Sequence, residues 1–280
     1  MTDSQLEQVI SKLAGLSSGR VGVCAETLDA SHRINVNADE VFPAASSIKM
    51  FVLFTLLVKA EAKQLSLADR VEYQAGFAEP GSGVLVHLDP GLRPTLKDLA
   101  TLMMMISDNS ALNLLIDYLG LEVINEEIAR LELEQTRIGD WSNFREAHAD
   151  SMALSKSTPR EFVFFLLRMR RGELLDAASQ TVFWDILRIQ KYIEPLRKYL
   201  PASPWAREFD MPEPVWVASK TGSLDDCSTE SGLIRVNQGG WAISIMTRDL
   251  PSVSSGPEDR GERLISDISL LVYEAWVEHT

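Results

Sequence analysis

Apolar residues recur at helical spacing near the start of the chain and again near its end. The first group is Leu6, Val9, Ile10 and Leu13, and the second, from about Pro257 onward, is Leu264, Ile265, Ile268, Leu271, Val272 and Trp276. Side chains at this spacing share one face of a helix. We therefore expect a helix at each end of the chain, with one face buried.

Short apolar runs of the kind typical of strands lie next to both helices. Two such runs cover residues 21–27 and 33–37, and the polar residues 29–32 between them predict the turn of a hairpin. Three more cover 215–218, 232–236 and 241–246, with a turn over 237–240 between the last two. Together these runs predict five strands.

The middle of the chain, from about Ser46 to about Tyr199, has mostly helical periodicity. Its most apolar stretch, residues 50–58, is far shorter than the roughly 20 residues of a membrane span, so we expect a buried helix. Two Ser/Thr-x-x-acid capping boxes, Thr95 with Asp98 and Thr158 with Glu161, predict helix starts. A proline-rich stretch over 201–214 ends this region.

These elements predict an α+β fold, an α/β sandwich with a five-stranded antiparallel sheet, terminal helices on that sheet and a helical subdomain beside it. We assign residues 1–45 and 205–280 to the sheet-containing subdomain and residues 46–204 to an all-helical subdomain. The two form one structural unit.

The composition limits the possible partners. The 280 residues contain 40 Asp and Glu against 27 Lys and Arg, a formal charge of -13, which disfavours binding to nucleic acid. No run is apolar enough to predict a membrane segment, and Cys24 and Cys227 are too few for a disulfide framework, so we expect free thiols. The first residues are polar and acidic, which predicts a cytoplasmic protein, or a periplasmic or secreted one if a leader was removed.

Several motifs that would indicate a catalytic or cofactor site fail on context. The Gly15–Gly19 segment matches Gly-x-Ser-x-Gly around Ser17, but it follows a helix and precedes a strand, the reverse of a nucleophile elbow. The histidines do not pair at zinc-protease spacing, and no phosphate-binding loop is present in the sequence. We therefore expect no metal and no cofactor.

Three other motifs occur in a characteristic order. Ser46 and Lys49 form Ser-x-x-Lys where a loop enters the apolar helix, so a hydroxyl and an amine share one helix face. Residues 107–109 read Ser-Asp-Asn, and residues 220–222 read Lys-Thr-Gly at the expected end of a strand. This set resembles the penicillin-recognising serine hydrolases, most closely the class A β-lactamase family.

The resemblance implies a five-stranded sheet, a helical subdomain and an active site between them. It also implies that Ser46 is the acylated nucleophile, Lys49 its proton acceptor and Ser107 the proton relay, with Lys220 supporting Ser107 and attracting a substrate carboxylate. The substrate-binding residues it implies are Asn109, Thr221, Gly222 and Ser223, and the backbone N–H groups of Ser46 and Ser223 would form the oxyanion hole.

The chain departs from the class A pattern where the resemblance would place the deacylation base. Alignment on Thr136 and Trp141 puts Ser142 at the position of the family's water-activating glutamate and Glu146 at that of its water-holding asparagine. Glu146 is therefore the substitute base that we consider, ahead of Asp140. Beyond Lys-Thr-Gly, acidic residues 225–226 would disfavour an anionic substrate.

We expect a serine hydrolase that acts through a covalent acyl-enzyme on a small molecule, either a β-lactam or a related small ester or amide. Two alternatives stay open: a penicillin sensor that is acylated once without turnover, and a D-Ala-D-Ala peptidase. The oligomeric state does not follow from the sequence.

Overall fold

The computed structural model describes residues 1–141, 150–191, 195–201, 206, 209, 211–237, 239–250 and 259–277. The helices are α1 (Asp3–Gly15), α2 (Lys49–Glu61), α3 (Leu96–Met105), α4 (Asn109–Leu119), α5 (Leu121–Arg130), α7 (Ser151–Leu154), α8 (Pro159–Arg171), α9 (Ala177–Arg188) and α10 (Arg260–Val277). The strands are β1 (Arg20–Thr27), β2 (Arg33–Val36), β3 (Phe42–Pro43), β4 (Arg137–Ile138), β5 (Ser155–Ser157), β6 (Val215–Leu224), β7 (Cys227–Val236) and β8 (Gly239–Arg248). Short 3-10 turns cover Ala45–Ile48, Ala75–Phe77 and Leu85–His87.

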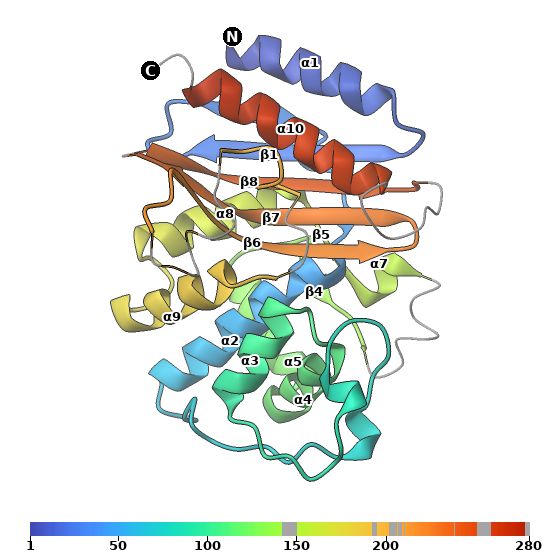
Figure 1. Ribbon diagram of the computed structural model, residues 1–280, viewed down its shortest axis with the longest axis vertical. Helices are drawn as coiled ribbons and strands as arrows, with labels where there is room; N and C mark the ends of the chain where they lie inside the picture. Colours follow the sequence, from blue (N-terminus) through green and yellow to red (C-terminus); the bar gives the residue numbers. More distant parts are fainter. Residues whose placement is uncertain are drawn as a thin grey trace.

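Five of the strands form one antiparallel sheet in the order β2-β1-β8-β7-β6. Both terminal helices lie together on one face of this sheet, and the remaining helices lie on its other side (Figure 1). The α+β fold predicted from the sequence is therefore confirmed. Strand β6 is the edge strand nearer the helical part of the molecule (Figure 1).

Successive strand residues point to opposite faces, so each strand contributes to two cores. On β8, Trp241, Ile243 and Ile245 pack under α1 and α10, whereas Ala242 and Met246 join the core shared with the helical part. Helix α2 runs through the centre of that second core. Its residues from Lys49 to Leu57 are all buried, as expected for a helix that is apolar on every side.

Three local predictions differ from the structure. The Lys-Thr-Gly triplet does not end a strand, because β6 continues through it to Leu224. The 46–204 region is not all helical, since the two-residue strand β4 and the three-residue strand β5 pair with each other, and β5 pairs with β3. At α8, the Thr158 hydroxyl accepts the Glu161 N–H as predicted, but the Glu161 carboxylate accepts hydrogen bonds from Gln135 and Thr136 instead of closing the box.

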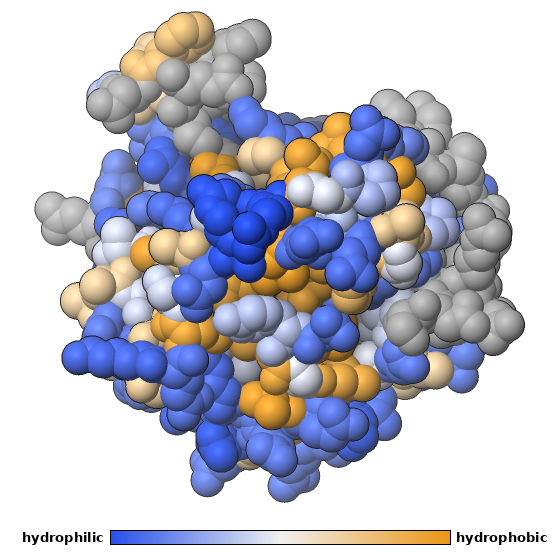
Figure 2. Space-filling view, turned by 90° about the horizontal axis from the view of Figure 1, so that it is seen from below, coloured by the Kyte–Doolittle hydropathy of each residue, from blue (hydrophilic) through white to orange (hydrophobic). Residues whose placement is uncertain are grey.

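No helix within the described residues has the length and apolar character needed to cross a bilayer. Seen from the helical end of the molecule, the surface alternates between apolar patches and hydrophilic side chains (Figure 2).

The Asp108 carboxylate connects two parts of the helical region. One oxygen caps α4 by accepting the Ala111 N–H at 2.9 Å, and the other accepts the N–H groups of Val84 and Leu85 at 2.7 and 2.9 Å. Gly83 allows this approach, since a Cβ at that position would lie 2.3 Å from Asp108 Cγ and the residue has a φ of +115°. The loop before α3 is thus fixed against the start of α4.

We expect Asp108→Ala to lower the free energy of unfolding by about 3 kcal/mol or more, because it leaves buried N–H groups without an acceptor as well as removing a cap. Asp176→Ala is the matched control: Asp176 caps α9 in the same way but is exposed and accepts only the Ser179 N–H in that role. Its loss should be about 1 kcal/mol. Urea unfolding of both variants tests this, and equal losses would contradict it.

Candidate active site

Ser46 lies in the 3-10 turn that leads into α2, directly against the edge strand β6. The residue before it, Ala45, has a φ of +43°, a left-handed conformation that is strained for a side chain with a Cβ. A Cβ on Gly222 would lie 2.6 Å from the Ser46 nitrogen and 2.8 Å from the Ser47 nitrogen, so only glycine permits this approach. Ser47 secures the contact by donating to the Lys220 carbonyl at 2.9 Å.

The Ser46 side chain is partly exposed, in contrast to its buried neighbours Ser47 and Lys49. Within the part of the chain that the structure describes, its hydroxyl makes no hydrogen bond. A partly exposed hydroxyl without such a partner is free to meet a molecule from solution.

The Lys49 amine is fully buried and contacts two residues of the Ser-Asp-Asn motif. Its Nζ lies 2.7 Å from the Ser107 carbonyl oxygen, 2.8 Å from Asn109 Oδ1 and 3.1 Å from the Ser107 hydroxyl. The Trp141 ring covers it, with 5.4 Å from Nζ to the ring centroid. Burial, and secondarily the charge of Lys220, hold the pKa of Lys49 well below its usual value, although Asp108 opposes the shift.

The partners of Lys49 match a neutral amine, which has two N–H donors and one lone pair. The Ser107 carbonyl and Asn109 Oδ1 can only accept, so they take the two donors. The Ser107 hydroxyl can donate, so it can fill the lone pair. The geometry therefore provides a direct proton path between Lys49 and Ser107.

Backbone conformation at the motif makes this arrangement possible. Ser107 has a φ of +56°, which turns the chain between α3 and α4. Asn109 is buried, and its side-chain amide joins Lys49 to the Pro80 carbonyl, to which Nδ2 donates at 3.0 Å.

The Lys220 amine is also fully buried, and burial lowers its pKa to about 7, with Glu230 opposing the shift. Nζ donates to the Thr221 carbonyl at 2.9 Å and to Gln190 Oε1 at 3.3 Å. The predicted support of Ser107 by Lys220 is absent as a hydrogen bond among the described residues. Lys220 instead acts on Lys49 through its charge.

Gln190 was not identified from the sequence. It follows α9, is buried, and its Oε1 also accepts from the Thr221 N–H at 2.9 Å and from the Thr221 hydroxyl at 3.0 Å. No motif contains this residue, so only the fold brings it to β6. The Thr221 N–H must point away from β7 to reach Gln190, and Ser223, two residues on and exposed, presents its N–H on the same edge.

The structure thus brings Ser46, Lys49, Ser107, Asn109, Lys220, Thr221 and Gly222 together, with Ser223 on the same edge. Ser142 and Glu146 lie outside the described residues, so their roles stay predictions. Asp140 is exposed. Asp225 and Asp226 form the turn between β6 and β7, where the Ser151 hydroxyl donates to Asp226 at 3.4 Å.

Other groups with possible chemistry lie elsewhere or are inert. Both cysteines are free and buried, and burial raises the pKa of each thiol to about 12, which disfavours a nucleophilic thiolate. The described residues hold no cluster of metal-ligating side chains.

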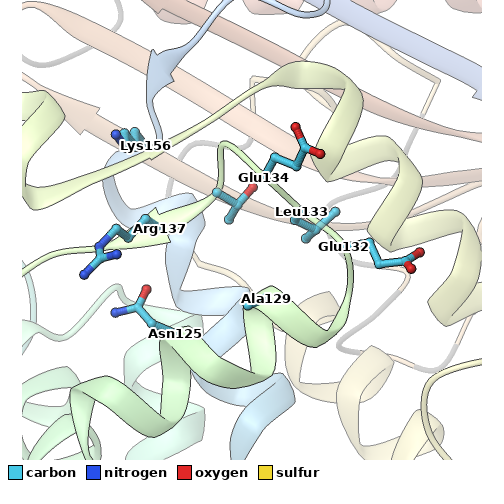
Figure 3. Close-up of a pocket in the computed structure, with 8 residues that line it drawn as sticks. Asn125, Ala129, Glu132, Leu133, Glu134, Arg137 and Lys156 are labelled. Carbon is cyan, nitrogen blue, oxygen red and sulfur yellow. The ribbon is translucent and has the colours of Figure 1, made fainter.

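A separate hollow of about 420 Å³, beside α5 and β4, is lined by Asn125, Ala129, Glu132, Leu133, Glu134, Thr136, Arg137 and Lys156 (Figure 3). Its one hydroxyl, on Thr136, bonds to Ser157 and Glu161.

A five-stranded sheet whose edge strand faces a serine just before a buried helix and a lysine at its start defines the β-lactamase and transpeptidase-like class of α+β proteins. Residues 5–276 match the Beta-lactamase enzyme family, and the chain belongs to this family.

Known proteins with similar sequences carry β-lactamase names. Beta-lactamase SME-1 of Serratia marcescens is 25% identical over 181 residues, which cover 64% of this chain and only 61% of that protein. A beta-lactamase of Bacteroides uniformis is 24% identical and covers 97% of this chain and 91% of its own length.

Solved structures agree over nearly the whole chain. A beta-lactamase from Sphaerobacter thermophilus DSM 20745 has a TM-score of 0.85 and 28% identity, covering 98% of both chains. PBP-A has a TM-score of 0.84 and 25% identity, covering 98% of this chain and 97% of its own. The family assignment made from the sequence is therefore confirmed.

The lowered pKa of Lys49 predicts a pH dependence for modification of Ser46. Only the neutral amine can accept a proton, and it predominates above the pKa, so the rate should fall as the pH drops through that pKa and level off above it. Rates of adduct formation with a neutral fluorophosphonate, measured between pH 5 and 9, check this. The fall in rate at low pH should be absent in Lys49→Ala. If the fall persists in that variant, a group other than Lys49 causes it.

Proposed function

We propose that this protein is a serine hydrolase that forms an acyl-enzyme on Ser46 with a β-lactam or a related small ester or amide. The observation that carries the proposal is the buried amine of Lys49, which lies three residues after the partly exposed Ser46. Burial lowers the pKa of this amine, and the amine is hydrogen-bonded to Ser107. Membership of the Beta-lactamase enzyme family, whose members act on small molecules, supports this chemistry for the protein.

In the first half-reaction, neutral Lys49 accepts the Ser46 proton while Ser46 Oγ attacks the carbonyl carbon. The bond from that carbon to the leaving nitrogen or oxygen then breaks. Ser107 donates its proton to the leaving atom and regains one from Lys49, so the lysine is neutral again. The N–H groups of Ser46 and Ser223 would hold the developing oxyanion, a contribution worth roughly 3 to 4 kcal/mol per donor in serine hydrolases.

Asn109 and Thr221 supply substrate contacts in this proposal. An amide nitrogen carries two N–H groups, and the one that does not bond to Pro80 can donate to a substrate carbonyl. Thr221 and Lys220 converge on a position suited to a negatively charged oxygen, and Gln190 Oε1 accepts hydrogen bonds from both at this position. A similar fold supports such chemistry: the structure of a single-residue mutant of PBP-A, 26% identical with a TM-score of 0.83, is described as an acyl-enzyme complex with penicillin G.

We expect intact-mass analysis after incubation with a penicillin or a fluorophosphonate to find one adduct, located on Ser46. Ser46→Ala should abolish it, and Lys49→Ala should slow its formation by roughly 10² to 10⁴, the usual effect of removing a general base. Ser17→Ala is the control, because Ser17 is the other serine in a catalytic-type motif and should label as the wild type does. Labelling of Ser46→Ala would overturn the assignment.

Deacylation is the step in which this chain differs from class A enzymes. With Ser142 at the glutamate position, a β-lactam acyl-enzyme lacks its usual general base. Its hydrolysis should therefore be slower than in an enzyme that has this base, by a factor of roughly 10² to 10⁴. A simple ester can still turn over if Lys49, neutral again, activates the water. The second candidate function is a penicillin sensor that is acylated once. Ser142 favours it, because without a deacylation base the acyl group stays on the protein.

Burst kinetics with a chromogenic cephalosporin and a p-nitrophenyl ester separate these outcomes. We expect a stoichiometric burst with slow turnover of the cephalosporin and steady turnover of the ester. Ser142→Glu should raise cephalosporin turnover while leaving the ester nearly unaffected, and Glu146→Gln should change neither by more than a few-fold. If Glu146→Gln abolishes deacylation of both, then Glu146 is the base.

A further inference from the structure

The side-chain oxygen of Gln190 is surrounded by donors on β6. It accepts from the Thr221 N–H at 2.9 Å, the Thr221 hydroxyl at 3.0 Å and the Lys220 amine at 3.3 Å. A neutral amide oxygen has two lone pairs, so three donors exceed its ordinary capacity. A backbone N–H, a hydroxyl and an amine that converge on one point form a site suited to a carboxylate oxygen.

The hydrogen bonds around Gln190 fix which way its amide faces. Its Nε2 lies 3.5 Å from the Ser219 hydroxyl, and that hydroxyl donates to Glu230 at 2.6 Å, so it can only accept from Gln190. The Thr221 N–H on the other side can only donate. The carbonyl oxygen must therefore be the atom that faces Lys220 and Thr221.

The backbone next to Gln190 is held in place. The Lys191 N–H donates to the Met105 carbonyl at 2.8 Å, which ties the end of α9 to the end of α3. Gln190 is buried, with an exposed fraction of 3%. The Gln190 side chain is thus part of the site wall.

The position that Gln190 Oε1 occupies adjoins the part of β6 that contacts Ser46. Thr221, which donates to Gln190, directly precedes Gly222, and a Cβ on Gly222 would lie 2.6 Å from the Ser46 nitrogen. A substrate carboxylate near its scissile bond would compete for the same donors as Gln190. The acidic turn at Asp225 and Asp226, just beyond Ser223, adds negative charge at this end of β6.

We propose that Gln190 is a specificity-determining residue whose side-chain oxygen occupies the anion position between Lys220 and Thr221, so that the site favours neutral esters and amides over substrates with a carboxylate beside the scissile bond. This inference rests on the proposed function and deepens it by naming the substrate class. A carboxylate-bearing substrate has to displace the amide before it can use these donors.

The test compares a chromogenic cephalosporin that carries its carboxylate with the methyl ester of the same compound, so that the two substrates differ in charge and by one methyl group. The measured quantity is the ratio of kcat/KM for acylation, carboxylate over ester. Titration with a neutral fluorophosphonate gives the fraction of active protein, so that a misfolded fraction does not enter the ratio.

Gln190→Ala should raise this ratio at least tenfold, because it frees the donors of Lys220 and Thr221. Gln190→Glu keeps the size of the side chain but adds a negative charge, and should lower the ratio below that of the wild type. Gln180→Ala is the matched control. Gln180 lies on the same helix α9, bonds to the Leu175 carbonyl, and should leave the ratio at the wild-type value.

The outcomes separate this inference from the proposed function. If fluorophosphonate and ester modify Ser46 but Gln190→Ala leaves the ratio unchanged or lowers it, the role of Gln190 is wrong and the hydrolase proposal stands. If no reagent modifies Ser46 in any variant, both are wrong.

Discussion

The burial of the Lys49 amine is the constraint on which the rest of the site depends. An ammonium group in this position would lose its hydration, and among the described residues no carboxylate lies within hydrogen-bonding distance of it, so the fold disfavours the charged form. The apolar faces of α2, the Trp141 ring and the Ser-Asp-Asn turn all contribute to that burial. The burial that places α2 in the core therefore also favours the neutral, basic form of its first residue, Lys49.

The second requirement is a fixed distance between the sheet and the helices. Gly222 lets β6 approach the start of α2, and Ser47 joins the two through the Lys220 carbonyl. On the other side of Lys49, the Asp108 carboxylate holds the turn that presents Ser107 and Asn109. Gly222 and the buried polar groups of Ser47 and Asp108 thus set the positions of the reactive side chains.

The sequence predicted the sheet, the terminal helices and the residues of the three motifs that the structure brings together, because each has a local signal: alternation, helical spacing, a cap or a motif. It did not predict the short sheet of β3, β5 and β4, since two or three residues carry no periodicity. The Glu161 side chain does not take part in the predicted capping box, because its carboxylate accepts hydrogen bonds from residues 135–136, which lie far from its helix start in the sequence. Gln190 carries no motif, and only the packing of α9 against β6 reveals its partners.

The two buried thiols have a further consequence. Cys24 on β1 and Cys227 at the start of β7 are within the sheet, and with a pKa of about 12 neither gives much thiolate at neutral pH. Exchange with an external disulfide needs an exposed thiolate, so it can occur only after the side chains that cover the thiol on its face of the sheet have moved away. The cysteines are thus natural reporters of local opening, one in the middle of β1 and one beside the hairpin turn that borders the site.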